Sequence, residues 1–220
     1  MAVAMSQSTF TILLGGEIQL TDRLIEAVAG TRVIAADGGM RHAIGLGLEP
    51  ELWVGDFDSA PAALTDTFQH VPRRPYPAAK AATDGEIAVS EAIRLGARRL
   101  VLVGALAGDR SDHALQHLLY AVRLAEDGFD VLLTSGTEEA VPLIPGAIEL
   151  DLPKASLFSV AGFSELIGLS IESARYPLTD FPLPFGSSRT ISNVAEGKVH
   201  FTLQSGRAIV LARPYDLSGV

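Results

Sequence analysis

The chain has 220 residues, a formal net charge of −9 at pH 7 and no cysteine, and 48% of its residues are hydrophobic. This length allows one large domain or two small ones, and the acidic balance argues against nucleic acid or an anionic membrane as the main partner, because both bind basic surfaces. The lack of cysteine excludes disulfides and fits a reducing compartment, and no apolar run approaches the roughly 20 residues of a membrane-spanning helix, so we expect a cytoplasmic protein.

Strand and helix patterns alternate through the first 137 residues. Short apolar runs predict strands, and apolar residues at helical spacing predict helices. Strands are predicted at residues 10–16, 32–39, 52–56, 98–106 and 129–135, and helices at residues 21–30, 40–48, 61–68, 83–97 and 111–128. Thr21 and Thr83 stand at helix starts, where a threonine oxygen caps free backbone N–H groups. Such alternation predicts a parallel sheet covered by helices.

The pattern changes after about residue 137. Residues 138–146 contain two prolines and a glycine, and we interpret them as a linker. Short alternating segments follow, without a convincing helix, at residues 148–152, 156–162, 166–173, 198–206 and 207–213. We therefore predict an α/β chain of two domains. Residues 1–137 form a Rossmann-like parallel sheet with flanking helices, and residues 138–220 form an all-β sandwich.

Acids and glycines follow three of the predicted strands, where ligands of parallel α/β sheets bind. The three segments are Asp37-Gly38-Gly39, Gly55-Asp56-Phe57-Asp58 and residues 104–112. Asp56 and Asp58 allow two interpretations. They are turn formers, or they form a cation site, because carboxylates two apart in an extended chain point the same way and repel each other unless a cation lies between them. The recurrence of acids at three strand ends favours the cation site.

Further charged residues precede two predicted helices. Lys80 lies four residues before Asp84, and Arg110 lies just before the next helix. Both groups have a structural alternative. Asp84 is favoured in the first turn of a helix without any ligand. Ser111 can cap the next helix while the charged residues around it, including Arg110, lie in solvent. Together with the acid pair after the third strand, these residues suit a magnesium ion that holds phosphates, with bases that offset the remaining phosphate charge. The residues alone thus predict a Mg²⁺-dependent enzyme that acts on phosphates.

In the same order, these segments resemble the motifs of the thiamine pyrophosphokinase family. The matching motifs are ADGG (36–39), GDFDS (55–59), K-x-x-T-D (80–84), GALAGDRSDHAL (104–115), RYPL (175–178) and ISN (191–193). Each is short, but their ordered combination is specific and spans nearly the whole chain. The resemblance implies transfer of a diphosphate from ATP to the hydroxyethyl group of thiamine, leaving AMP. It also implies a homodimer of chains with an α/β domain followed by a β-sandwich.

The resemblance also implies a role for each matching residue. Asp56, Asp58 and Asp84 would ligate Mg²⁺, and with Arg110 and Asp112 they form the expected catalytic set. The residues expected to bind ATP and its phosphates are Asp37, Gly38, Gly39, Lys80, Thr83 and His113, and those expected near thiamine are Ser192 and Asn193. The active site is expected at the interface of the two subunits.

Two positions depart from the family's pattern. The family usually shows G-G-R-x-D-H where this chain has residues 107–113 with one residue inserted, and an Asn common in the family is His117 here. Two alternatives to the kinase remain: a relative that binds nucleotide or thiamine without transfer, and a Mg²⁺-dependent phosphohydrolase. The intact acid set favours the kinase, because a pure binding module has little reason to hold three repelling carboxylates.

Overall fold

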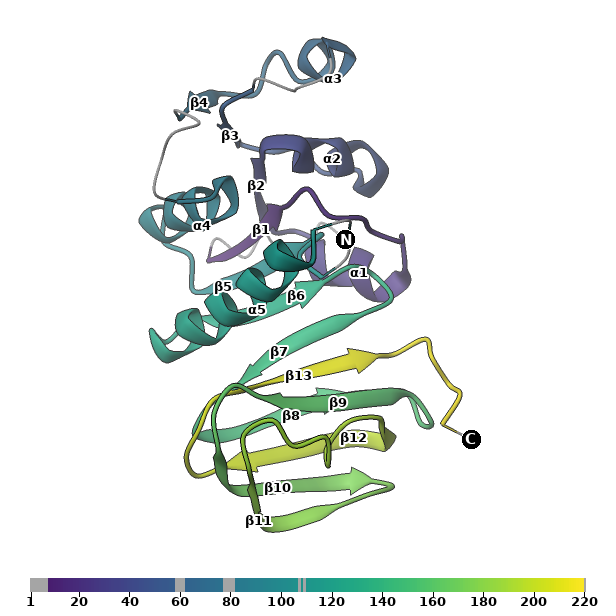
Figure 1. Cartoon of the computed structure of the whole chain (residues 1–220). Coiled ribbons are helices and arrows are strands. Elements are labelled where there is room, and N and C mark those ends of the chain that lie inside the picture. Colours follow the sequence, from purple (N-terminus) through teal and green to yellow (C-terminus); the bar gives the residue numbers. More distant parts are fainter. Residues whose placement is uncertain (1–7, 58–61, 77–81, 107, 109, 220) are drawn as a thin grey trace. The chain divides into compact units, whose positions relative to one another are not determined.

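The computed structural model describes residues 8–57, 62–76, 82–106, 108 and 110–219 (Figure 1). The chain divides into two compact units. The N-terminal unit contains Met1–Ala114 and Phe129–Gly136, and the C-terminal unit contains Leu115–Gly128 and Thr137–Val220. In the described part of the chain, the helices are too short or too polar to cross a membrane.

The N-terminal unit contains a parallel sheet, as the alternating pattern predicts. Its strands are β1 (Thr9–Leu13), β2 (Arg32–Ala36), β3 (Leu52–Gly55), β4 (Arg73–Pro75), β5 (Arg99–Val103) and β6 (Asp130–Thr134). Their order across the sheet is β6-β5-β1-β2-β3-β4, and every neighbouring pair runs parallel. Except for β4, whose sequence is Arg-Arg-Pro, the strands carry almost continuous apolar runs, because a parallel sheet is covered on both faces.

Helices connect these strands. They are α1 (Asp22–Val28), a 3₁₀ turn η1 (Asp37–Met40), α2 (Arg41–Leu46), α3 (Ala62–Thr67), α4 (Asp84–Arg94) and α5 (Ser111–Glu126), which begins in this unit. The two predicted N-caps are confirmed. The Thr21 side chain accepts a hydrogen bond from Leu24 N, and Thr83 forms a reciprocal capping box with Glu86. These caps fix where α1 and α4 begin.

A hydrophobic core lies between the sheet and the helices of this unit. Its largest member is Trp53 of β3, which is fully buried. The other buried members are Leu13, Leu24, Val28, Val33, Ala35, Met40, Ala43, Phe68, Val71, Val101 and Val103. Because residues at the carboxyl ends of β1, β2 and β5 belong to this core, the loops that follow those strands start from fixed positions.

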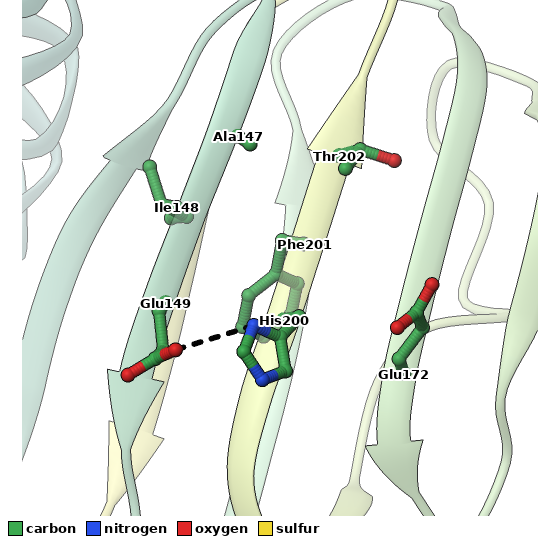
Figure 2. Close-up of a pocket in the computed structure, with 7 residues that line it drawn as sticks. All are labelled: Ala147, Ile148, Glu149, Glu172, His200, Phe201 and Thr202. Atoms are coloured by element: carbon green, nitrogen blue, oxygen red, sulfur yellow. Dashed lines mark ion pairs between the residues drawn. The ribbon is translucent and has the colours of Figure 1, made fainter.

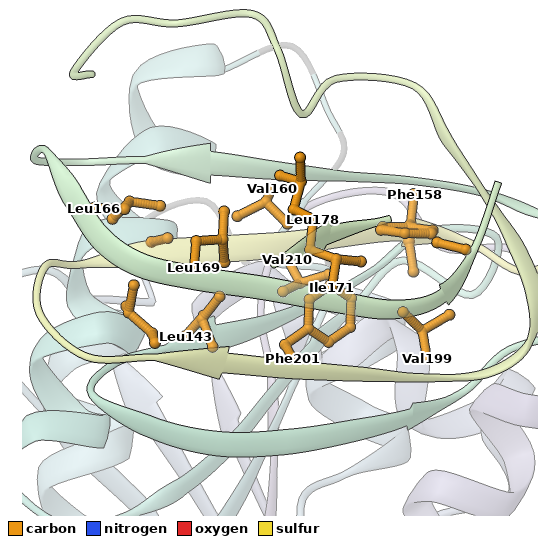
Figure 3. Packing of buried hydrophobic residues seen from close by; sticks show 14 of the residues in the cluster. Leu143, Phe158, Val160, Leu166, Leu169, Ile171, Leu178, Val199, Phe201 and Val210 are labelled. Carbon is orange, nitrogen blue, oxygen red and sulfur yellow. The ribbon is translucent and has the colours of Figure 1, made fainter. Parts of the chain in front are cut away.

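The C-terminal unit contains antiparallel strands around a second core (Figure 3). The strands are β7 (Glu139–Leu143), β8 (Gly146–Asp151), β9 (Leu157–Gly162), β10 (Leu166–Ala174), β11 (Leu178–Leu183), β12 (Asn193–Leu203) and β13 (Ala208–Arg213). They pair as β7-β13-β9 and as β8-β12-β10-β11, and the first two residues of β12 pair with β9. Both groups contribute to the core, including Val160 and Val210 from the first and Ile171 and Phe201 from the second.

The linker predicted at residues 138–146 is wrong, because the segment contains β7 and the start of β8. Proline lacks a backbone N–H and is rare inside sheets, which is why the segment resembled a linker. In the structure, Pro142 lies opposite Ile209 of β13, and four of the five β7 residues are buried. Burial thus stabilises this strand despite its proline.

Candidate active site

The carboxyl ends of the parallel strands meet at one edge of the N-terminal unit. Strands β2 to β4 extend the sheet on one side of β1, whereas β5 and β6 extend it on the other. The strand order therefore reverses between β1 and β5, and open α/β sheets bind ligands beyond the strand ends at such a switch point. Two backbone hydrogen bonds join the loops there: Leu14 N donates to Val103 O at 2.8 Å, and Gly16 N donates to Gly104 O at 3.1 Å.

Two glycines let the loops at this edge touch through their backbones. A Cβ atom on Gly39 would lie 2.1 Å from Leu13 O, and one on Gly104 would lie 2.7 Å from Leu14 O. Neither position accepts a side chain unless the loop after β1 moves. Gly39, which is predicted for the ATP site, also has a structural role: it brings the loop after β2 against the end of β1.

Asp37 and Phe57 have left-handed backbones at this edge, with φ of 42° and 59°. Such residues are held against a cost of about 1–3 kcal/mol each, and they cluster at functional sites. Trp53 contacts both of them. Its indole N–H donates to Asp37 O at 2.9 Å, and its ring meets the Phe57 ring edge-on at a centroid distance of 5.1 Å. Trp53 thereby fixes the turn that carries Asp56.

Asp56 and Asp84 are the two predicted magnesium ligands that the structure describes. Asp56 directly follows β3, and Asp84 is the first residue of α4, which packs against β1, β2 and β3. A helix that connects two parallel strands must run back along the sheet, so it begins at the carboxyl edge, where Asp56 also lies. Both side chains are half-buried. Carboxylate oxygens are ligands that Mg²⁺ accepts.

Two predicted residues, Asp58 and Lys80, lie outside the described residues. Among the described ones, no three His, Asp or Glu side chains lie close enough together to hold a metal ion. The predicted trio of carboxylates therefore stays a prediction.

Described residues before residue 77 and after residue 81 form hydrogen bonds with α4. After residue 81, the Thr83 oxygen accepts a bond from Glu86 N at 3.2 Å. Before residue 77, the Tyr76 hydroxyl donates to Glu91 of α4 at 3.2 Å, and Arg74 forms an ion pair with the same carboxylate. Burial alone would raise the pKa of Glu91, but the hydrogen bonds from its partners outweigh this effect and lower the pKa. The charged Glu91 thus ties the end of β4 to α4.

Arg110 and Asp112 form a two-pronged ion pair at the start of α5. The guanidinium Nε donates to Oδ1 at 2.9 Å, and Nη2 donates to Oδ2 at 2.7 Å. The hydrogen bonds from Arg110 lower the pKa of Asp112, and those to Asp112 raise the pKa of Arg110. Both side chains are about two-thirds exposed, 66% and 65%, and His113 is also exposed. Arginine has five N–H donors, so Arg110 can bind a phosphate while Asp112 orients it.

The two residues expected near thiamine lie in the C-terminal unit, at the start of β12. Asn193 is only 3% exposed, and its side chain bridges to the backbone of Tyr176. Its Oδ1 accepts from Tyr176 N at 3.1 Å, and its Nδ2 donates to Tyr176 O at 2.9 Å. Ser192 is exposed, has a left-handed backbone with φ of 59°, and donates its N–H to Ser159 Oγ at 3.0 Å. Asn193 therefore shapes this corner, and Ser192 is presented at its surface.

A shallow hollow of about 400 Å³ lies on β8, β12 and β10 of the C-terminal unit (Figure 2). Its lining residues include Glu149, Glu172, His200 and Thr202. His200 forms an ion pair with Glu149 at 3.3 Å, and Lys198 forms another with the same carboxylate at 3.0 Å. These pairs are typical of the solvated face of a sheet, and the hollow contains none of the predicted site residues.

Comparison with known proteins identifies the family. The thiamin pyrophosphokinase catalytic domain matches residues 27–133, and the thiamin pyrophosphokinase vitamin B1 binding domain matches residues 149–208. The chain belongs to the thiamin pyrophosphokinase family. Membership of this family implies ATP-dependent synthesis of thiamine diphosphate, so the chain is an enzyme, a thiamine diphosphokinase. No curated protein sequence gives a significant match to the chain.

Solved structures of thiamine pyrophosphokinases share the fold. The Bacillus subtilis protein is 22% identical with a TM-score of 0.83, over 93% of this chain and 98% of that one. The Geobacillus thermodenitrificans protein is 23% identical with a TM-score of 0.80, over 96% and 100% of the two chains. The Candida albicans protein is 12% identical with a TM-score of 0.77, over 94% and 90%. These likenesses establish the mixed α/β fold of the family for this chain.

Three residues near the family's matching motifs were missed by the sequence analysis: Trp53, Arg41 and His42. Trp53 appeared there only as part of an apolar run, and Arg41 and His42 only as part of a short helix. All three side chains donate hydrogen bonds to backbone carbonyl groups of other loops, and the spacing of residues in the sequence does not reveal such contacts. The available signal was the Gly15-Gly16 pair at the end of β1, because two glycines after a central strand indicate close backbone approach.

Proposed function

We propose that this thiamine diphosphokinase transfers the terminal diphosphate of ATP to the hydroxyethyl oxygen of thiamine and releases AMP. The new bond joins the thiamine oxygen to the β-phosphorus, the bond between the β-phosphorus and the oxygen of the α-phosphate breaks, and the hydroxyl proton is released. The observation that supports this most is the carboxyl edge of the N-terminal unit. Asp37, Asp56 and the start of α4 at Asp84 follow neighbouring parallel strands there.

Mg²⁺ is proposed as the metal, with Asp56, Asp58 and Asp84 as its protein ligands. Oxygen donors are what this ion prefers, and two of the three carboxylates lie at the sheet edge where phosphates are expected. When bound, the ion offsets negative charge on the phosphates during transfer. The three carboxylates would otherwise repel both one another and the phosphates.

The other predicted residues are proposed to bind and orient. Arg110 holds the transferred diphosphate through the donors that Asp112 leaves available, and Lys80 and the backbone near Gly38 contact ATP. Thr83 fixes the start of α4. Thiamine is placed beside Ser192, at the corner that Asn193 shapes through Tyr176.

We further propose a Rossmann-like domain followed by a β-sandwich, and a cytoplasmic homodimer. The strand reversal between β1 and β5 supports the first domain, and the core shared by two groups of antiparallel strands supports the second. The dimer is proposed from the family resemblance, with one chain's β domain completing the other chain's site.

The test is AMP release measured with and without thiamine, in the presence of ATP and Mg²⁺. The kinase releases AMP in proportion to the thiamine supplied. A relative without transfer activity releases none under either condition. A phosphohydrolase releases nucleotide products whether or not thiamine is present.

A further inference from the structure

Arg41 and His42 join two loops at the switch point of the N-terminal sheet. The Arg41 guanidinium donates to Gly38 O at 3.2 Å, in the loop after β2, and to Gly15 O and Gly16 O at 2.5 and 3.3 Å, in the loop after β1. His42 Nε2 lies 2.8 Å from the same Gly16 O. Four hydrogen bonds thus converge on backbone carbonyls of three glycines.

His42 is suited to a fixed donor role. Its side chain is buried, and burial lowers its pKa below the usual value of 6.5, so the ring is neutral at pH 7. Since Gly16 O can only accept, the ring carries its proton on Nε2. Arg41 is exposed and, in the described part of the chain, pairs with no carboxylate, so its charge remains at the edge where phosphates are expected.

Backbone hydrogen bonds from Gly16 N to Gly104 O and from Gln19 N to Ser135 O also hold the loop after β1, but one side of this loop is open. A Cβ atom on Gly15 would meet nothing within 4 Å, so this residue borders open space. Because a trans peptide places C=O and N–H on opposite sides, a Gly16 carbonyl that faces Arg41 and His42 turns the N–H of Glu17 away from them. Gly108, in the loop after β5, lies close to the same peptide: its Cβ position is 3.4 Å from Gly16 Cα and 3.8 Å from Glu17 N.

We propose that Arg41 and His42 are positioning residues for the nucleotide. They hold the carbonyls of Gly15 and Gly16 on one side of the loop, so that its glycine backbone and the Glu17 N–H stay available to ATP phosphates at the switch point. The inference rests on the proposed function, because it takes ATP as the ligand of this edge. It concerns ATP and not thiamine, since all of these residues belong to the N-terminal unit and the predicted thiamine residues do not.

The experiment compares Arg41→Ala with a matched control, Arg32→Ala. Arg32 is also an arginine of the N-terminal unit that donates to a backbone carbonyl, Leu95 O at 3.2 Å, but it begins β2 and so lies at the opposite end of the strand. The Kd of α,β-methylene ATP in the presence of Mg²⁺ is measured by calorimetry. This analogue has a methylene group in place of the oxygen whose bond breaks in the reaction, so it binds without being consumed. The KM for thiamine is measured separately with ATP. Circular dichroism records the melting temperature of each variant.

Arg41→Ala is expected to raise the Kd of the analogue about tenfold, as the loss of a set of charged hydrogen bonds does, and to leave the KM for thiamine within about twofold. Arg41→Lys is expected to weaken nucleotide binding nearly as much, because one ammonium group cannot reach carbonyls on both loops. His42→Ala is expected to weaken nucleotide binding, because it removes the donor to Gly16 O, and His42→Gln is expected to recover most of that loss, because its amide N–H can still donate there.

Three results would overturn the inference. Equal nucleotide affinity in Arg41→Ala and Arg32→Ala would show that the bridge has no role in binding. Full affinity in Arg41→Lys would show that charge alone matters. An equal loss of ATP and thiamine binding in Arg41→Ala would indicate general disorder. If the wild type itself bound no ATP analogue, the proposed function would fail first.

Discussion

Substitution of Trp53 by phenylalanine tests whether this residue sets the geometry of the acid-bearing turn. The indole N–H donates to Asp37 O at 2.9 Å, and the ring supports Phe57, whose backbone is left-handed. Phenylalanine keeps an aromatic ring but removes the donor and part of the volume. Asp37 O then loses the indole donor, and the turn between Phe57 and β3 loses its support.

The expected loss of stability combines two effects. Loss of the indole donor to this part-buried carbonyl costs about 1–3 kcal/mol. Removing part of a fully buried side chain adds about 1 kcal/mol, less than a full truncation to alanine. A total of about 2–4 kcal/mol lowers the melting temperature by roughly 5–15 °C for a chain of this size. Because the turn that carries Asp56 shifts, we also expect turnover to fall by about tenfold or more.

The assay follows unfolding by circular dichroism and turnover by AMP release. Fluorescence is unsuitable for the variant, since Trp53 is the only tryptophan of the chain. Leu24→Ala is the control, because Leu24 is 1% exposed in the same core and its loss costs about 2–5 kcal/mol without touching the turn. If the two variants lost stability alike and kept equal turnover below their melting temperatures, the proposed role of Trp53 in positioning would be refuted.

Four further outcomes are expected. Asp56→Asn should lower kcat about a hundredfold at saturating Mg²⁺ with an unchanged circular dichroism spectrum, because a charge beside the phosphates is lost; near-normal turnover would contradict its metal role. Arg110→Lys should lower kcat more than it changes the KM for thiamine, because one lysine ammonium cannot both pair with Asp112 and bind the transferred diphosphate. A change in the KM for thiamine alone would show that Arg110 does not contact the diphosphate. Burial lowers the pKa of His42 in the folded chain, so the unfolded chain binds more protons as the pH drops below 6.5, and the free energy of unfolding falls. His42→Gln should reduce this fall, measured as the change of the urea midpoint with pH. An equal fall in the variant and the wild type would count against the burial of His42 as its cause. Asp56→Asn and Asn193→Ala, each with strongly reduced activity, should regain activity when unfolded and refolded together if two chains share the site. Mixed dimers that stay as weak as their parents would show that each chain builds its own site.

The parallel sheet was predictable because its signals are local. Five of its strands were expected from apolar runs, and the two helix caps at Thr21 and Thr83 are confirmed. The missed strands have weak local signals. β4 has three residues, β7 contains Pro142, and β11 contains Pro182 and two polar residues, Thr179 and Asp180. β7 also pairs with β13, a partner far along the chain, which a local pattern cannot show.

The candidate site was predictable where it depends on strand ends. Asp37, Asp56 and Asp84 lie at the carboxyl edge because each follows a strand or starts a returning helix. The contacts that hold this edge were not predictable, because they join side chains to backbone carbonyls of other loops. The bonds from Trp53 to Asp37 O and from Arg41 to Gly16 O are of this kind.

The most direct measurement is the identity and ratio of the products formed from ATP, thiamine and Mg²⁺. Chromatography with mass detection should show thiamine diphosphate and AMP appearing in equal amounts, with neither formed when thiamine or Mg²⁺ is left out. Formation of ADP with thiamine monophosphate, or of AMP with free diphosphate in the absence of thiamine, would contradict transfer of a diphosphate from ATP to thiamine by this chain.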